Sequence, residues 1–381
     1  IFLSVVSFSM IFPLLPLYAQ LFNASNFTIG ALAASFAVAQ LIVSPLWGIL
    51  SDKYGRRPII AIGLLGIAVN FFLFGLATGI FMLFISRFMQ GIFSGALMVS
   101  ARAYIADLTT PEERIRAMGY VGAALSLGVI LGPAIGGMFA EINISLPFYA
   151  ASVLALVNFF FVAKFIPESL NIRGVVPIRI KEILLTNLTA IPKGIRGPLG
   201  PLYTLAFIWS FALANNQVAV PLLAVERFSL GLGEIGWIFS ITGIVAAFTQ
   251  FFLITRIVSF IGERKTILLG LTILSLGFVA MPLLPPILGL LFLAGAIAGF
   301  GSAISRPTIT ALISKETTEE QGVTMGTASA FESLARLVGP LLGGFLFGFF
   351  IPLPFFFSAI LVFLALLYIY TQTSFLKKKN P

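Results

Sequence analysis

The sequence predicts an all-α membrane protein with twelve transmembrane helices, arranged as two similar six-helix bundles. Three observations support this fold class: the composition, the recurrence of apolar segments, and the alternation of charge between successive loops. Hydrophobic residues make up 59% of the 381 residues, and charged residues make up only 10%. A soluble domain carries about 25% charged residues, so this chain has too few charges to cover a water-facing surface.

Apolar segments recur along the whole chain, each about 20 residues long, which is the length that an α-helix needs to cross a bilayer core. The 36 Gly and 21 Pro fit this prediction because membrane helices tolerate both residues. We expect the spans at residues 1–22, 28–50, 58–78, 80–106, 114–139, 146–166, 199–223, 232–260, 265–285, 287–313, 323–350 and 354–376.

Lys and Arg are concentrated in every second loop, whereas the loops between them are nearly free of both, with Arg227 the clear exception. The basic set is Lys53, Arg56, Arg57, Arg114, Arg116, Arg173, Arg179, Lys181, Lys193, Arg196, Arg256, Arg264, Lys265, Lys315, Lys377, Lys378 and Lys379. The positive-inside rule places this set in the cytoplasm. We therefore expect a multi-pass protein of the cell (plasma or inner) membrane with both termini cytoplasmic. This topology explains the net charge of +9 without nucleic acid as a partner.

A polar, basic connector at 168–198 divides the chain into an N-terminal bundle (1–167) and a C-terminal bundle with a basic cytoplasmic tail (199–381). The middle of the connector, 178–188, is either a short amphipathic helix on the membrane surface or a flexible linker. The two bundles share the pattern Gly-Pro-x-x-Gly-Gly, which begins at Gly132 and again at Gly339. Matched halves suit alternating access, in which two bundles rock about a central site.

The chain contains neither Cys nor His. These absences exclude a disulfide framework, thiolate metal sites and the commonest metal ligand. Proton chemistry would therefore depend on carboxylates. With no Walker loop, metal cluster or catalytic triad in the sequence, we expect no enzyme activity, no metal, no cofactor and no ATP-driven transport. The expected partners are membrane lipid, a small-molecule substrate and protons as coupling ion, and we expect a monomer.

The connector between the second and third spans carries the most specific motif. Its residues are Gly48, Asp52, Gly55, Arg56 and Arg57, in the order Gly-x3-Asp-x2-Gly-Arg-Arg. This pattern resembles motif A of the major facilitator superfamily and falls in the same cytoplasmic loop. The resemblance implies a charge lock on the outward-facing state, in which Arg56 pairs with Asp107 at the cytoplasmic end of the fourth span. The alternative is an ordinary basic loop that obeys the topology rule.

Two further motifs resemble the twelve-helix drug:proton antiporter branch of that superfamily. Arg87-x2-Gln90-Gly91 is similar to motif B of proton-coupled members, which implies a role in proton coupling for Arg87 and Gln90. Alternatively, Arg87 lies near the outer end of its helix and extends to the interface. The fifth span is similar to motif C, the antiporter signature, through Gly128, Gly132, Pro133, Gly136 and Gly137, and the eleventh repeats it as Gly339, Pro340 and Gly343. Generic close packing of helices is the alternative.

Polar residues inside the spans are candidates for coupling and for substrate contact. Glu332 is the one acidic residue placed well inside a predicted span, and Arg336 lies one turn away, so their rearrangement can load or release a proton. Two alternatives are a permanent pair that tightens the bundle and a solvated Glu332 near the cytoplasmic end. The first span lacks the acid that several proton-coupled drug exporters carry there. Candidate cavity residues, each also able to bridge helices, are Asn215, Asn216, Gln217, Gln40 and Asn158.

The function that this sequence predicts is secondary active transport, with proton-coupled efflux of small hydrophobic compounds or drugs by alternating access in the major facilitator fold. The alternative is a facilitator or symporter for a small metabolite such as a sugar or carboxylate. An anion carrier would need a cationic cavity, to which only Arg87, Arg102, Arg306 and Arg336 could contribute. A membrane receptor or lipid-handling protein on the same scaffold is a third interpretation.

Overall fold

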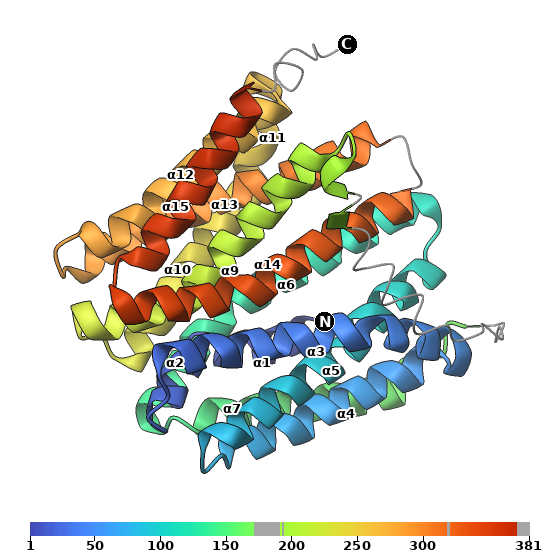
Figure 1. The fold of residues 1–381 in the computed structure, drawn as a ribbon. Helices are drawn as coiled ribbons and strands as arrows, with labels where there is room; N and C mark the ends of the chain where they lie inside the picture. Colours follow the sequence, from blue (N-terminus) through green and yellow to red (C-terminus); the bar gives the residue numbers. More distant parts are fainter. Residues whose placement is uncertain (171–190, 193, 318–320, 372–381) are drawn as a thin grey trace. The chain divides into compact units, whose positions relative to one another are not determined.

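The computed structural model describes residues 1–170, 191–192, 194–317 and 321–371, and this part of the chain is helical and contains no strand (Figure 1). The first half holds α1 (Phe2–Ile11), α2 (Leu15–Gln20), α3 (Asn26–Tyr54), α4 (Arg56–Gly75), α5 (Ile80–Leu108), α6 (Pro111–Ile142) and α7 (Leu146–Phe165). The second half holds α9 (Gly200–Phe228), α10 (Leu232–Phe248), the π-helix η1 (Thr249–Leu253), α11 (Ile254–Ile261), α12 (Glu263–Leu283), α13 (Leu288–Glu316), α14 (Gln321–Phe349) and α15 (Leu353–Thr371).

The predicted all-α membrane fold is confirmed. Within the described residues, ten helices are long and apolar enough to cross a membrane, and the shorter apolar helices Phe2–Ile11 and Leu353–Tyr368 lie in the first and twelfth predicted spans. The first span differs in detail, because α1 and α2 replace one continuous helix. Pro13 lies between them and lacks the backbone N–H that would continue the hydrogen-bond ladder. Most of the 168–198 connector, including 178–188, lies outside the described residues.

The chain forms two compact units. The first comprises Ile1–Leu184 together with Leu230–Ser240, and the second comprises Leu185–Ser229 and Ile241–Pro381. In the first unit α1 packs on α6 and α7, while α4 packs on both α5 and α7.

The second unit repeats these helix pairings. There α9 packs on α14 and α15, while α12 packs on both α13 and α15. The contact of α9 with α14 thus corresponds to that of α1 with α6, and α12 with α13 corresponds to α4 with α5. The two bundles predicted from the repeated Gly-Pro-x-x-Gly-Gly pattern therefore share one packing scheme.

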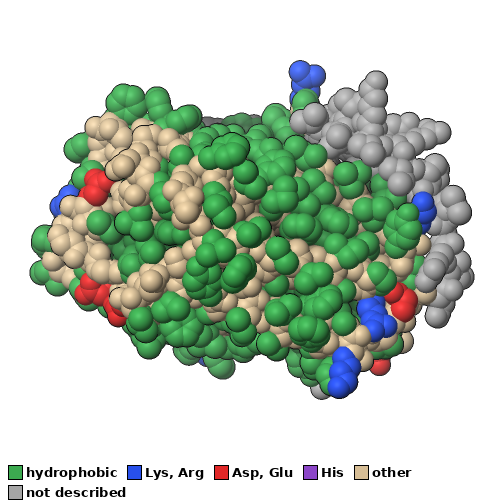
Figure 2. Space-filling view, turned by 90° about the horizontal axis from the view of Figure 1, so that it is seen from below, with side chains coloured by type: hydrophobic (Ala, Val, Ile, Leu, Met, Phe, Trp, Pro, Cys, Tyr) green, Lys and Arg blue, Asp and Glu red, His purple; other side chains and the backbone are tan. Residues whose placement is uncertain are grey.

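The helices expose large apolar side chains rather than burying them all. Phe160, Phe161 and Phe252 are each more than half exposed, as are many Leu and Ile side chains. The visible face in Figure 2 is mainly hydrophobic, and its few charged side chains lie near the margins. Exposed apolar surface on this scale marks a lipid contact. Helices satisfy their backbone hydrogen bonds internally, as the absence of water in the bilayer core requires.

Candidate functional site

A turn with an unusual backbone joins α3 to α4 at one end of the first unit. Gly55, between Tyr54 and Arg56, has φ of 107°, in the region that side chains other than glycine rarely adopt. Space is also restricted, because a Cβ on Gly55 would fall 2.8 Å from the carboxyl carbon of Glu168. The glycine of the predicted motif therefore permits both the turn and the close approach of a carboxylate.

Arg56 lies at the centre of a charged cluster that joins three helices. Its Nε lies 3.0 Å from Oδ2 of Asp107 at the end of α5, and its guanidinium also pairs with Asp52 of α3. Its Nη1 donates to Ser51 Oγ at 3.2 Å. Only 11% of the Arg56 side chain is exposed, so these charge-assisted contacts form where solvent screens them weakly. The structure thus brings together Arg56 and Asp107, the pair that the resemblance implies, and adds Asp52 of the same motif as a second partner of Arg56.

Glu168, which the sequence did not single out, completes this cluster. Its Oε1 accepts from the backbone N–H of Arg56 at 2.8 Å, and its Oε2 accepts from that of Arg57 at 3.2 Å. The carboxylate therefore caps the N-terminus of α4, where the helix dipole favours negative charge. Gly55 provides no side-chain cap. A helix that begins with Gly-Arg-Arg-Pro needs an acceptor from elsewhere, but the sequence does not indicate which residue supplies it.

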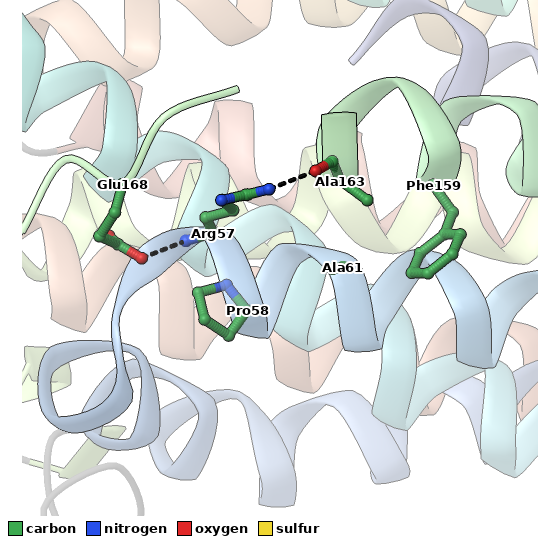
Figure 3. Close-up of a pocket in the computed structure, with 6 residues that line it drawn as sticks. All are labelled: Arg57, Pro58, Ala61, Phe159, Ala163 and Glu168. Carbon is green, nitrogen blue, oxygen red and sulfur yellow. Dashed lines mark hydrogen bonds between the residues drawn. The ribbon is translucent and has the colours of Figure 1, made fainter. Parts of the chain in front are cut away.

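A recess of about 420 Å³ adjoins this cap between α4 and α7 (Figure 3). Its lining residues are Arg57, Pro58, Ala61, Phe159, Ala163 and Glu168. The guanidinium of Arg57 points toward α7 and donates to the carbonyl oxygen of Ala163. Arg57 therefore joins α4 to α7, while its neighbour Arg56 joins α4 to α3 and α5. Gly48, the first residue of the motif, faces Val99 of α5.

The second unit contains a reduced copy of this arrangement. Gly262, before α12, has φ of 82° and corresponds to Gly55. Arg264 pairs with Glu316 at the end of α13, as Arg56 pairs with Asp107 at the end of α5. The position that corresponds to Asp52 is Ser259, whose hydroxyl instead donates to the carbonyl of Arg256 at 2.9 Å. The pairing of an arginine with an acid is kept, but the additional acid is not.

The glycine stripe of α6 packs against α1. A Cβ on Gly128 would lie 2.7 Å from Val5 Cβ, and Cβ atoms on Gly132 and Gly136 would overlap Ser9 and the Met10 backbone. The α6 helix contains Pro133, and Gly137 lies against Leu232 and Gly233 at the start of α10.

The glycine stripe of α14 packs against α9 in the same way. A Cβ on Gly339 would lie 2.9 Å from Ala214 Cβ, and one on Gly343 would lie 2.7 Å from the carbonyl oxygen of Asn215. The α14 helix contains Pro340, as α6 contains Pro133. These contacts show close packing, which is common to both interpretations of the motif.

Arg87 and Gln90 form a buried pair within α5. Arg87 Nη1 donates to Gln90 Oε1 at 2.6 Å, and the guanidinium lies 5.3 Å from the centre of the Phe36 ring. Arg87 is 3% exposed, so within its unit it is buried rather than extended toward a surface. Arg87 Nε and Gln90 Nε2 have no hydrogen-bond partner among the described residues. A buried guanidinium without a carboxylate partner among the described residues is costly in a membrane.

Glu332 and Arg336 lie together on α14, at an N–O distance of 3.4 Å. The structure adds Arg306 of α13, whose Nη2 lies 3.8 Å from the same carboxylate oxygen. Arg336 also donates to Ser333 Oγ at 3.1 Å. Sequence reasoning paired Glu332 with Arg336 alone, because Arg306 is distant in the chain.

The predicted amides divide into two groups. Asn158 donates to Ser4 Oγ at 2.7 Å, and Asn215 donates to Pro354 O and Ser358 Oγ, both at 2.7 Å. Asn216 is buried beside Asn215 and donates to the Ala212 carbonyl at 2.8 Å. These three amides make contacts within their own units, as does the half-buried Gln40, whose Nε2 donates to Ser94 Oγ at 3.5 Å, and Gln217 is half-buried.

Comparisons with known proteins agree with this geometry. The family model described as "Major Facilitator Superfamily" matches residues 1–187 and 202–381. "Multidrug resistance protein 2" of Bacillus subtilis (strain 168) is 33% identical over 371 residues, which are 96% of this chain and 91% of that protein. "Tetracycline resistance protein, class G" of Vibrio anguillarum is 32% identical over 89% of this chain and 86% of its own length.

Solved structures show the same fold. The crystal structure of the human organic anion transporter MFSD10 (TETRAN) covers 96% of both chains with a TM-score of 0.71. Its sequence identity to this chain is 23%, so this likeness concerns the fold alone.

Proposed function

The chain belongs to the major facilitator superfamily, and we propose that it exports small, largely apolar compounds across the bacterial plasma membrane in exchange for protons. The named multidrug and tetracycline resistance relatives match it over nearly its whole length, which supports efflux as the direction of transport. Alternating access of the two units is the mechanism that we propose, and it agrees with their shared packing scheme.

The observation that carries the proposal is the charged cluster around Arg56. It joins α3, α4, α5 and the segment after α7 through one guanidinium and the carboxylates of Asp52, Asp107 and Glu168. We propose that the cluster is a lock that stabilises one conformation of the transporter. A loss of 1.4 kcal/mol shifts a two-state equilibrium about tenfold, so even one weakened pair would change the populations measurably.

A double-mutant cycle tests the lock. The variants are Arg56→Gln, Asp107→Asn and their combination, and spin-label distances between the units report the conformational populations. We expect each single variant to shift the populations, and the double variant to shift them no further than one single variant. Additive shifts would mean that the two residues do not act on this equilibrium through their pair.

Proton coupling is assigned in this proposal to Glu332. Its side chain is 18% exposed and lies within the membrane-spanning part of α14. Influx of one proton releases about 2.3 kcal/mol per 100 mV of membrane potential, and a pH gradient adds to this.

Flux measurements in proteoliposomes test the transport function. A hydrophobic fluorescent dye is loaded, and its efflux is followed with and without an imposed inward proton gradient. We expect the gradient to accelerate efflux in the wild type and in Glu226→Gln, a matched substitution of an exposed carboxylate. We expect Glu332→Gln to abolish the acceleration. Equilibration that ignores the gradient would indicate a facilitator, and absence of flux would indicate a receptor.

The proposed topology is testable because the chain has no native cysteine. The exposed Tyr54, at the end of α3, is replaced by Cys in whole cells. We expect a membrane-permeant maleimide to label Tyr54→Cys and an impermeant one to leave it unmodified. Labelling by the impermeant reagent would place this loop outside and invert the assigned orientation.

A further inference from the structure

The recess between α4 and α7 has its charged groups at the helix ends and its apolar side chains further in. Arg57 is the second residue of α4, and Ala163 lies in the last turn of α7. Ala61 and Phe159 line the recess one helical turn deeper, about 6 Å further along each helix axis. A phospholipid has the same order, because its phosphate lies at the membrane interface and its acyl chains extend into the hydrocarbon core.

The recess adjoins exposed apolar surface. Pro58 lines it and is itself exposed. Ile62 and Phe160 each follow a lining residue in the chain, and they are 46% and 61% exposed. The volume of about 420 Å³ is within the range of ligand pockets. Room for part of an acyl chain is therefore present beside surface of the kind that contacts lipid.

The carboxylate of Glu168 lines the recess but already has its own donors. Its Oε1 accepts from the backbone N–H groups of Arg56, Ser169 and Leu170 at 2.8, 3.0 and 3.2 Å. Its Oε2 accepts from the N–H of Arg57 at 3.2 Å. Backbone donors thus stabilise the negative charge on both oxygens, so this carboxylate needs no cationic group from a ligand.

The guanidinium of Arg57, by contrast, has a neutral partner. It donates to the carbonyl oxygen of Ala163 (Figure 3), and among the described residues it forms no ion pair. Its side chain is only partly buried. A guanidinium has five N–H donors in a planar arrangement that fits a phosphate group. Donors therefore remain on Arg57 for a phosphate that approaches through the recess.

We infer that the recess binds a membrane phospholipid, whose phosphate accepts from Arg57 and one of whose acyl chains lies against Ala61 and Phe159. Basic pockets between transmembrane helices on the cytoplasmic side bind lipid head groups in this way, and Arg57 lies on that side in the proposed topology. The inference goes beyond the export function and does not depend on it, because lipid binding is measured without any gradient.

Native mass spectrometry of the purified full chain in detergent tests the inference. The probes are dioleoylphosphatidylglycerol, dioleoylglycerol, which has the same acyl chains but no phosphate, and glycerol phosphate, which has the phosphate but no chains. We expect the phospholipid to bind about tenfold more tightly than either of the others. Equal binding of dioleoylglycerol would mean that the phosphate is not recognised, and equal binding of glycerol phosphate would indicate a site for free phosphate. Either result would overturn the inference.

Variants of Arg57 separate phosphate binding from a structural role. We expect Arg57→Gln to weaken phospholipid binding about tenfold and to leave dioleoylglycerol unchanged, while Arg57→Lys retains part of the affinity because an ammonium still attracts phosphate. The matched control is Lys164→Gln, which removes an exposed charge at the same end of α7 but outside the recess lining. Equal weakening in this control, or equal loss of both lipids in Arg57→Gln, would refute the assignment.

A substitution in the apolar part of the recess tests the place of the acyl chain. Ala61→Phe fills the space between α4 and α7, and we expect it to weaken phospholipid binding about tenfold. Ile62→Phe is the matched control, because it adds a ring at the next position, which is not part of the lining. Size-exclusion chromatography checks that both variants are folded. Unchanged phospholipid binding in folded Ala61→Phe would place the lipid outside the recess and overturn the inference.

Discussion

Replacement of Glu168 by Gln tests whether this carboxylate stabilises the start of α4. The side chain accepts from the N–H groups of Arg56 and Arg57 through its two oxygens. Gln has only one side-chain oxygen, so one of these acceptors becomes a donor, and the negative charge near the helix dipole is lost. A hydrogen bond to a charged group contributes about 1.5–3 kcal/mol. Because Glu168 is partly exposed, we expect a loss of about 1–2 kcal/mol, after allowance for solvent screening.

Amide hydrogen exchange measures this loss directly. The wild type and Glu168→Gln are compared in nanodiscs, and the peptide that covers the start of α4 is followed. A loss of 1–2 kcal/mol raises the local opening equilibrium, and with it the exchange rate, by a factor of about 5–30. The peptide at the start of α12 is the internal control, and Glu226→Gln is the control variant. Unchanged exchange at α4, or equal acceleration at α12, would refute the capping role.

Two further predictions concern glycines and use matched controls within the chain. Gly55 and Gly262 both have a positive φ, which disfavours alanine at either position. The added Cβ would also clash with the Glu168 carboxylate at Gly55, whereas at Gly262 it would have no heavy atom within 4 Å. We expect both to lower the midpoint of thermal unfolding in detergent, and Gly55→Ala to lower it more; equal shifts would contradict the steric argument. Gly132→Val places its side chain against α1, whereas a Cβ added at the control position Gly122 meets nothing within 4 Å. We expect only Gly132→Val to reduce folded yield, by overpacking that costs about 1–3 kcal/mol, as measured by size-exclusion chromatography.

The membrane spans were predictable because their signals are local. Long apolar segments are read directly from the sequence, and caps mark several helix starts. Ser25 accepts from the Thr28 N–H at the start of α3, and Thr110 with Glu113 forms a capping box at the start of α6. The break between α1 and α2 was also a local signal, since Pro13 lies within the predicted first span.

The candidate site was only partly predictable, because its contacts join distant residues. The motif around Arg56 has a family pattern, so Asp107 was found as its partner. Glu168, 112 positions beyond Arg56, has no such pattern. The amide of Asn158 was a candidate for the cavity or for a bridge between helices, and within its unit it donates to Ser4, which is 154 positions away. Whether an amide faces a cavity or another helix depends on how the helix is rotated about its own axis. The positions of the apolar segments in the sequence do not determine this rotation.

The comparison of the two halves separates scaffold from chemistry. Both units keep a positive-φ glycine before a helix, which is Gly55 in the first and Gly262 in the second. Both also keep an arginine at the start of that helix that pairs with an acid: Arg56 pairs with Asp107, and Arg264 pairs with Glu316. Features that duplication preserved in both halves serve the packing that both share. The membrane-embedded charges differ instead: Arg87 is buried in the first unit, and two arginines share Glu332 in the second. Because a charge inside a membrane is costly, we propose that these embedded charges take part in proton coupling.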